Sequence, residues 1–462
     1  MKILLTVHQF LPDYSAGTEI LTLDTARDLR RLGHEVFILS GHPAAVALPD
    51  DQRFEHYEYD GLPVVRFQHS HVPMGGQTNT TAAEYNNWLV AAYLRRFLRR
   101  NRPDIVHFFH LARLSGAVID VCHELGIPMV ATPTDFWFIC PTSQLRLPDH
   151  SLCTGPDANG VNCLRHVASL NQPARLQAKL RLLPDWALGL AIWATRRGFF
   201  SGSWFAPQLR ALAERPGFLR ERLNMLERVL VPTHLMERIL VNNGLRPEKV
   251  IYKPYGIELK YLRDVVRNRS ENVRLGFIGT LYEHKGAHIL LQAVKSLPDA
   301  GNLELRIYGR RDEFPAYVQQ LDTLAAGDPR IKFCGTFAND KIGEVLGSLD
   351  ALVVPSLWYE NTPLVVYSAQ AAKCPVIASD TPGLAEAIQH DVNGLLFERG
   401  NPLDLAKLLQ IVISDRTILE RLSEHAPAPK SIHDYVGELD SIYSDVLSSF
   451  RGKPVQPFPA HS

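Results

Sequence analysis

The chain has 462 residues, of which 46% are hydrophobic and 21% are charged. This composition is ordinary for globular proteins with large cores, and at roughly 150 residues per domain the length predicts two or three domains. The formal net charge is zero, so no general field favours nucleic acid, and nucleic acid is not expected as a partner.

The first half of the chain alternates short apolar strands with amphipathic helices. Its opening strand is too short to be the apolar core of a signal peptide, and His8 and Gln9 follow it directly. Helices are expected at 19–32 and 82–100. The expected strands are 2–7, 35–40, 63–68, 104–108, 128–132, 228–231 and 249–254. This alternation is typical of a parallel sheet covered on both faces, and it predicts an α/β domain at 1–262.

Two segments interrupt this pattern. Residues 140–171 are rich in Pro, Gly, Asp and Cys, which predicts an ordered loop, and 172–224 read as a helical insertion with many aromatic and arginine residues. Basic, aromatic helices can lie in the headgroup layer of a membrane. A similar mix at 88–100 is explained better by a core helix with solvated arginines. The insertion is therefore the candidate for contact with a membrane surface, although its apolar part, 186–195, is too short to span one.

The second half repeats the alternation after a polar, Arg-rich hinge at 257–272. Its expected strands are 274–279, 303–309, 331–334, 351–355, 375–378 and 394–397. They predict a second α/β domain at 263–428. The last segment, 429–462, is expected to form a helix from Asp434 that crosses back to the first domain, and then a flexible tail. Ligands of open parallel sheets bind beyond the carboxyl ends of the strands, so two such domains facing each other would form a binding cleft.

One carboxylate stands where a strand of the second domain gives way to a helix. This residue is Glu360, and the residues that open the helix after it are Asn361, Thr362, Pro363 and Leu364. The first N–H groups of a helix lack internal partners, so a carboxylate beside them suits a ligand with both hydroxyls and phosphates. A nucleotide-sugar is such a ligand.

A glycine and a lysine follow the first strand of the second domain. Gly279 lets backbone approach a ligand closely, and Lys285 lies within reach of phosphate oxygens. Taken alone, the same residues also fit a tight turn with a solvated lysine.

The order and spacing of these motifs carry a family resemblance. Besides Gly279, Lys285 and Glu360, the run comprises 305–309, 333–336, 351–356 and 375–380 with Gly383, Glu386 and Gly394. It closely resembles the nucleotide-binding C-terminal domain of the retaining glycosyltransferases of the large bacterial family four, of the glycosyltransferase group 1 type. The resemblance extends to the first domain through Gly17, Glu19, 27–36 and 103–114. It implies the α/β GT-B fold, in which two Rossmann-like domains face each other across a cleft.

The resemblance also implies a role for each matching residue. In the second domain Glu360 would contact the donor sugar as a catalytic residue, Lys285 and the backbone of 361–364 would contact the diphosphate, and the backbone near Gly335 would contact the base. The first domain would bind the acceptor. Its residues Gly17 and Glu19 would lie beside the diphosphate of the donor. No catalytic divalent metal is implied.

Three positions depart from the family pattern. Ser368 stands where a second Glu is expected, and losing a charged hydrogen bond of about 1.5–3 kcal/mol would weaken donor binding by about one to two decades. Thr280 stands where many members have Arg, and Thr134 replaces a His before Asp135. Asp135 is predicted to orient the acceptor or the sugar as a catalytic residue, the alternative being a turn aspartate.

Two histidines and three cysteines offer further chemistry. His107 and His110 end a strand and could bond the acceptor, but a structural role is favoured for each. Six cysteines in a chain without a leader are expected to stay reduced. Three of them and one histidine could form a structural zinc site, the alternative being thiols that pack as small hydrophobes. These four residues are Cys140, Cys153, Cys163 and His166.

The sequence therefore predicts a retaining glycosyltransferase of the hexosyltransferase type with a UDP- or GDP-sugar as donor. The acceptor is expected to be a cell-surface glycan precursor: a polysaccharide, a lipopolysaccharide or a lipid-linked oligosaccharide. The expected location is the cytoplasm, at the inner face of the cytoplasmic membrane. The alternatives are a catalytically weakened GT-B pseudo-enzyme or binding protein and, less favoured, a nucleotide-sugar epimerase.

Overall fold

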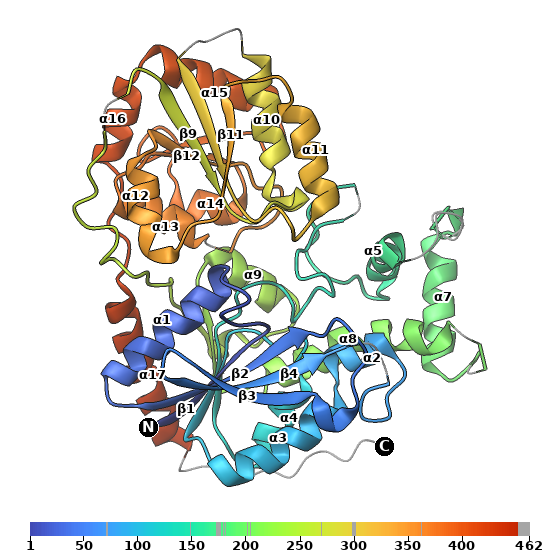
Figure 1. The fold of residues 1–462 in the computed structure, drawn as a ribbon. Helices are drawn as coiled ribbons and strands as arrows, with labels where there is room; N and C mark the ends of the chain where they lie inside the picture. Colours follow the sequence, from blue (N-terminus) through green and yellow to red (C-terminus); the bar gives the residue numbers. More distant parts are fainter. Residues whose placement is uncertain are drawn as a thin grey trace. The chain divides into compact units, whose positions relative to one another are not determined.

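The chain divides into two compact units. Unit 1 comprises Met1–Pro232, Met236–Lys253 and Val436–Ser462, and unit 2 comprises Thr233–Leu235 and Pro254–Tyr435. The computed structural model (Figure 1) describes residues 1–70, 73–147, 149–171, 177–178, 180, 182–200, 202–203, 205–268, 270–297, 302–361 and 363–450.

Unit 1 is built on a mainly parallel sheet. Over the described residues its eight strands run in the order β3-β4-β2-β1-β5-β6-β7-β8, and only β3 and β4 pair antiparallel. The strands are β1 (Lys2–Val7), β2 (Glu35–Pro43), β3 (Phe54–Tyr59), β4 (Leu62–His69), β5 (Ile105–Phe108), β6 (Met129–Ala131), β7 (Arg228–Val231) and β8 (Val250–Tyr252). The central strands β1 and β5 are near-continuous apolar runs because both of their faces are buried.

Unit 1 also contains several helices. They are α1 (Gly17–Arg31), α2 (Thr80–Tyr85), α3 (Trp88–Asn101), α4 (Ala117–Glu124), α5 (Val161–Asn171), α7 (Asp185–Arg196), α8 (Ala206–Leu223), α9 (His234–Asn242) and most of α17 (Ile432–Phe450). Two short 3-10 turns complete unit 1: η1 (Asp50–Gln52) joins β2 to β3, and η2 (Pro247–Lys249) joins α9 to β8. Helix α1 has Glu19 in its first turn and Arg30 and Arg31 in its last, which suits the helix dipole.

Two predictions for unit 1 were wrong. Strand β3 was not predicted, because Glu55, His56 and Glu58 interrupt the apolar alternation of its sequence FEHYEY, and only its pairing with β4 makes it an edge strand. The single helix predicted at 82–100 is two helices, α2 and α3. The break comes at Asn87, whose side chain accepts a hydrogen bond from the N–H of Val90 and caps α3.

The segment predicted as a loop at 140–171 ends in a helix. Asp157 stabilises the turn that leads into α5, because its carboxylate accepts hydrogen bonds from the backbone N–H groups of Asn159, Val161 and Asn162. The helical insertion predicted at 172–224 contains α7 and α8, while 172–176, 179, 181, 201 and 204 lie outside the described residues. The candidate membrane residue Trp204 is one of these.

Unit 2 contains a parallel sheet. In the described part of the chain its six strands run in the order β11-β10-β9-β12-β13-β14. They are β9 (Val273–Ile278), β10 (Leu303–Tyr308), β11 (Ile331–Gly335), β12 (Ala351–Val354), β13 (Val376–Ser379) and β14 (Leu395–Phe397). The other elements are η3 (Glu283–Lys285), α10 (Ala287–Ser296), α11 (Pro315–Ala325), η4 (Asn339–Lys341), α12 (Ile342–Gly347), α13 (Leu364–Ala371), α14 (Pro382–Ala387), α15 (Pro402–Ser414) and α16 (Thr417–Glu424). The prediction of two parallel-sheet α/β domains is confirmed.

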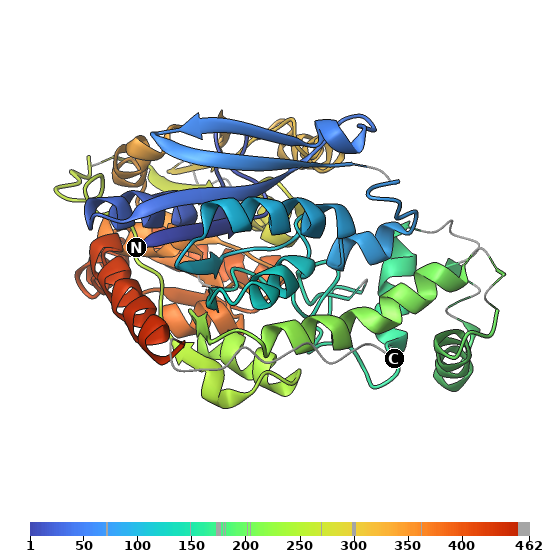
Figure 2. The same ribbon diagram turned by 90° about the horizontal axis from the view of Figure 1, so that it is seen from below.

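The last helix, α17, packs against unit 1 for most of its length. Both views place it, drawn in red, beside the N-terminus of the chain (Figure 1, Figure 2). Its Asp440 lies 2.9 Å from the His34 ring, and the Tyr443 hydroxyl lies 2.6 Å from Nδ1 of His107. Among the described helices, none combines the length and the apolar character needed to cross a membrane.

Candidate active site

In unit 2 three glycines end neighbouring strands. Gly279 follows β9, and its N–H donates to the carbonyl oxygen of Tyr308 at 3.1 Å. Gly309 follows β10, and its N–H donates to the carbonyl oxygen of Gly335 at 2.8 Å. A Cβ at Gly309 would lie only 2.4 Å from the Gly279 oxygen. A ligand beyond these strand ends would therefore meet main-chain groups rather than side chains.

The turn after Gly279 brings a lysine to the end of β12. Gly286 ends η3 with a φ of +74°, and a Cβ there would lie 1.8 Å from the carbonyl oxygen of Pro355. Only glycine lets these two segments approach so closely. As a result Nζ of Lys285 lies 2.8 Å from Oε1 of Glu360.

Glu360 is the centre of a buried polar cluster and is 3% exposed. Its Oε1 accepts hydrogen bonds from Lys285, from Nε1 of Trp358 at 2.9 Å and from the hydroxyl of Ser356. We call Lys285, Ser356, Trp358 and Glu360 the Glu360 cluster. Three donors on one oxygen fix the orientation of the carboxylate. One of them, Lys285, is a cation that can also pair with an anionic ligand.

The residues after Glu360 lead into α13. The Asn361 side chain accepts a hydrogen bond from the Thr233 hydroxyl at 3.1 Å and lies 3.4 Å from the Tyr255 hydroxyl, so it is engaged within unit 2. Pro363 is the N-cap residue of α13, and Leu364 begins the helix. Thr362 lies outside the described residues.

A second glycine, Gly383, packs closely against the main chain of Glu360. A Cβ at Gly383, in α14, would lie 1.6 Å from the carbonyl oxygen of Glu360. The main chain at Glu360 is therefore held between α14 and the end of β12.

Of the three positions that depart from the family pattern, Ser368 and Thr280 are in unit 2, whereas Thr134 is in unit 1, where its hydroxyl donates to the carbonyl oxygen of Phe109 at 3.3 Å. Ser368 is half-buried on α13, and Thr280 is half-buried directly after Gly279. Arg311, which follows β10, pairs with Asp322 at 2.8 Å and lies over the Phe333 ring, so its guanidinium is engaged away from Glu360. Lys285 is thus the cation that the structure places at Glu360.

In unit 1 a second group of polar side chains gathers after β1, β5 and β6. His110 follows β5, and its Nδ1 accepts the N–H of Ala112 at 3.0 Å. Its Nε2 therefore carries the proton and donates to Oδ2 of Asp135 at 2.7 Å. The other Asp135 oxygen accepts the N–H of Trp137 at 2.8 Å. The structure thus brings together Asp135 and His110.

The start of α1 lies beside this pair. Gly17 is the first residue of α1, and Glu19 in its first turn is fully buried. Nε2 of His8 lies 3.5 Å from Oε1 of Glu19, and the rings of His8 and His110 are 4.2 Å apart between centroids. We call His8, Glu19, His110 and Asp135 the His110 cluster.

Burial shifts the pKa of two members of this cluster, Glu19 and His8. It raises the pKa of Glu19 to about 7, although backbone hydrogen bonds and the Gln9 side chain partly offset the effect. It also lowers the pKa of His8 well below its ordinary value, and the neighbouring His110 and Arg113 lower it further. A neutral His8 and a Glu19 that titrates near neutrality make this end of unit 1 sensitive to a charged ligand.

His107 lies apart from this cluster in the interior of unit 1. Its Nε2 bonds the Thr132 hydroxyl at 2.8 Å, and its Nδ1 bonds Tyr443. Burial lowers the pKa of His107 to about 3, so the ring stays neutral. Its contacts are those of a structural residue.

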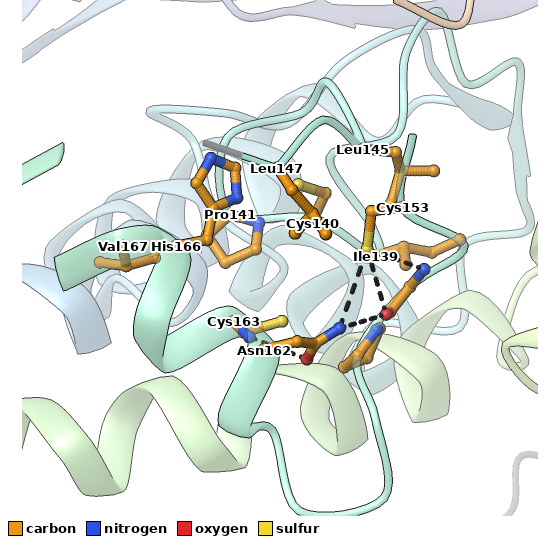
Figure 3. Close-up of a pocket in the computed structure, with 12 residues that line it drawn as sticks. Ile139, Cys140, Pro141, Leu145, Leu147, Cys153, Asn162, Cys163, His166 and Val167 are labelled. Carbon is orange, nitrogen blue, oxygen red and sulfur yellow. Dashed lines mark hydrogen bonds between the residues drawn. The ribbon is translucent and has the colours of Figure 1, made fainter. Parts of the chain in front are cut away.

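The four residues predicted as zinc ligands line one small cavity of about 10 Å³ in unit 1 (Figure 3). Cys140 and Cys153 come from the loop and Cys163 and His166 from α5, and all three thiols are free. Among the residues that the structure describes, no three His, Cys, Asp or Glu side chains are already arranged around one metal position.

Sequence reasoning missed His8, Ser356 and Trp358. Each is a polar or aromatic residue close behind a buried strand, which was the available signal: His8 follows β1, and Ser356 and Trp358 follow β12. The partner of His8 is Glu19 on α1, and the partner of Ser356 and Trp358 is Glu360. The sequence does not reveal how the turns between these residues fold.

The two units, each an α/β unit with polar groups beyond its strand ends, define a GT-B protein. Residues 261–428 match the family model for glycosyl transferases group 1, and residues 16–256 match that for the glycosyl transferase 4-like domain. The chain therefore belongs to the family of glycosyl transferases that these two models describe.

Individual relatives are more distant. The chain is 29% identical over 188 residues to an uncharacterized glycosyltransferase of Methanocaldococcus jannaschii, covering 40% of this chain and 47% of the relative. It is 29% identical over 198 residues to the amylovoran biosynthesis glycosyltransferase AmsK of Erwinia amylovora, covering 41% and 48%. The chain thus spans about half the length of the curated relatives it matches. Among solved structures, Anabaena HepE in complex with UDP and glucose has a TM-score of 0.61 and 16% identity, covering 96% of this chain and 99% of that one, a likeness in fold.

Proposed function

We propose that the protein is a retaining glycosyltransferase that moves a sugar from a nucleoside-diphosphate-sugar to a cell-surface glycan precursor. The observation that carries the proposal is the Glu360 cluster, in which a buried carboxylate and a lysine meet where β12 leads into α13. The carboxylate suits sugar hydroxyls, and the lysine with the unpaired N–H groups of the helix start suits a diphosphate. The UDP in the solved HepE structure and the role of AmsK in amylovoran biosynthesis support the donor and acceptor classes.

The cluster suggests how the donor is engaged. Lys285 pairs with Glu360, and a diphosphate would draw the ammonium group toward itself and release the carboxylate for the sugar. In the transfer, the bond between the anomeric carbon and the phosphate oxygen breaks while the acceptor oxygen bonds the same carbon on the same face. The acceptor proton passes to the departing phosphate. The protein contributes mainly position and charge stabilisation.

The His110 cluster is proposed to bind hydroxyl groups in unit 1. Asp135 is held by both His110 and the Trp137 N–H, which orients it as an acceptor of hydrogen bonds. Gly17 and Glu19 are proposed to contact the donor phosphates through the first turn of α1, where a protonated Glu19 would not repel an anion.

Turnover with defined donors tests the proposal. Purified protein is incubated with UDP- and GDP-sugars and a membrane extract as acceptor source, and bound donor, released nucleoside diphosphate and product anomers are measured. We expect one donor class to bind, and Glu360→Gln to lower turnover about 10- to 100-fold, the cost of one charged hydrogen bond. Glu424→Gln, an exposed residue of α16, is the matched control.

Each alternative gives its own result. Absence of donor binding, or full turnover by the Glu360 variant, contradicts the proposal. Binding without turnover favours a pseudo-enzyme. An epimerised nucleotide-sugar favours the epimerase, and a product of inverted configuration refutes retention.

An exposed apolar stripe on α7 supports contact with a membrane surface. Trp186, Leu190 and Trp193 are 74%, 56% and 48% exposed, while Leu188 and Ile192 on the other side of α7 are buried in a small core. The exposed Arg197 lies over the Trp193 ring at 4.8 Å. Aromatic side chains beside arginines suit an interface of anionic lipid headgroups.

Vesicle sedimentation tests this contact. We expect the protein to bind phosphatidylglycerol vesicles more than phosphatidylcholine vesicles, and the double change Trp186→Ala with Trp193→Ala to lower binding about tenfold. Trp88→Ala is the control, since Trp88 is 57% exposed on α3, whose arginine Arg95 is engaged by Glu124. Equal loss in both variants would refute a specific role for α7.

A further inference from the structure

Three separate stretches of unit 1 bring sulfur and imidazole ligands around one space. Cys140 ends a turn that begins at Asp135, Cys153 lies further along the loop, and Cys163 and His166 stand three residues apart on α5. Residues at this spacing share one side of a helix. The cavity they line, about 10 Å³, is about the size of a single small occupant (Figure 3).

Main-chain hydrogen bonds hold the three stretches in place. The N–H of Cys140 donates to Phe136 at 2.8 Å, the N–H of Cys153 donates to Leu145 at 2.7 Å, and Asp157 stabilises the turn that leads into α5. The thiols are thus held near one another by the backbone and not by disulfide bonds.

The groups around the cavity have the chemistry of a zinc site. Nitrogen donors already point at one sulfur: the N–H of Gly155 lies 3.4 Å and Nδ2 of Asn162 lies 3.8 Å from Sγ of Cys153. Such donors support thiolate ligands.

We propose that Cys140, Cys153, Cys163 and His166 bind one structural Zn²⁺ ion. Three thiolates and one imidazole complete a tetrahedral set with no open position, so the ion would not take part in the transfer reaction. Binding releases the three thiol protons to solvent and leaves the zinc redox state unchanged. Because the described side chains do not yet surround one metal position, binding requires them to rotate inward from their present contacts.

The site would stabilise the segment that carries Asp135. The N–H groups of both Ile139 and Cys140 bond the carbonyl oxygen of Phe136, so the turn between Asp135 and the first thiol is short and ordered. Binding of Cys140 to a metal would therefore also hold the Asp135 carboxylate in place, and this effect does not depend on which substrate Asp135 binds.

Metal content tests the proposal directly. Protein purified from zinc-supplemented cells without a histidine tag, then dialysed against a chelator, should retain about one zinc per chain by elemental analysis. Cobalt substituted for zinc should give the visible bands of a tetrahedral thiolate site. Cys163→Ser and His166→Ala should lower retained zinc to about a tenth or less, with a lower thermal midpoint.

Two further variants keep the test decisive if Cys163→Ser does not fold. His166→Cys replaces one ligand by another and should retain zinc, while Cys334→Ser, at an exposed cysteine of β11, should leave zinc unchanged. Zinc below about a fifth of an equivalent in the wild type after reconstitution under reducing conditions would overturn the proposal, as would equal zinc in wild type and His166→Ala. Either result would mean that the thiols pack as small hydrophobic groups.

Discussion

Glu19→Gln tests whether burial controls the carboxyl group at the start of α1. Glu19 is fully buried, and burial raises its pKa from 4.5 to about 7. Because the raised pKa favours the protonated group in the folded state, the stability it contributes is complete below pH 4.5 and is lost as the pH rises through 7. Between pH 5 and pH 8 this loss is about 2–3 kcal/mol of unfolding free energy, at about 1.4 kcal/mol per pKa unit.

The variant lacks the titrating group, so its stability relative to the wild type should rise by that amount over the same range. Urea unfolding at four pH values, followed by tryptophan fluorescence, measures the difference for unit 1, which contains every tryptophan except Trp358. Glu58→Gln, at an exposed residue of β3, controls for the general effect of removing a carboxylate. A difference that stays flat within about 0.5 kcal/mol would show that Glu19 titrates normally and would refute the burial argument.

Three further changes probe the two units. Lys285→Ala should weaken nucleoside-diphosphate binding about tenfold or more in calorimetry, because it removes the cation at Glu360, and affinity equal to that of the exposed control Lys332→Ala would contradict this. Ser368→Glu should strengthen donor binding about tenfold by restoring a carboxylate for the ribose, and unchanged affinity would show that Ser368 does not face the donor. Tyr443→Phe should lower the urea unfolding free energy by about 1–3 kcal/mol, since it removes the partner of buried His107. The loss should be the same at pH 5 and pH 8, because a pKa of about 3 keeps His107 neutral at both, and a loss that grew toward low pH would contradict the assignment.

The sheets were predictable because their strands are buried on both faces. Ala351–Val354 in β12 is apolar throughout, and Ile3–Val7 in β1 is apolar except for Thr6. A short apolar run between turn residues predicts a buried strand. Strand β3 was not predicted because it is half exposed at the edge of the sheet. At an edge, pairing with the neighbouring strand determines the structure more than the pattern of side chains does.

The candidate sites were predictable only in part. The position of Glu360 after β12 marks it in the sequence, but its contact with Lys285 depends on the close approach of Gly286 to Pro355, which only the folded backbone shows. The pairing of His110 with Asp135 likewise joins the ends of two neighbouring strands. The ligand roles of these residues remain predictions.

The helix α17 also sets an order of events during synthesis of the chain. Most of unit 1 precedes unit 2 in the chain, yet the buried side chains Val436, Leu439 and Tyr443 that complete it follow nearly all of unit 2. Until they emerge from the ribosome, His107 lacks its Tyr443 partner, and the apolar surface that α17 covers stays open to water and to chaperones. Unit 1 is therefore begun before unit 2 and completed after it.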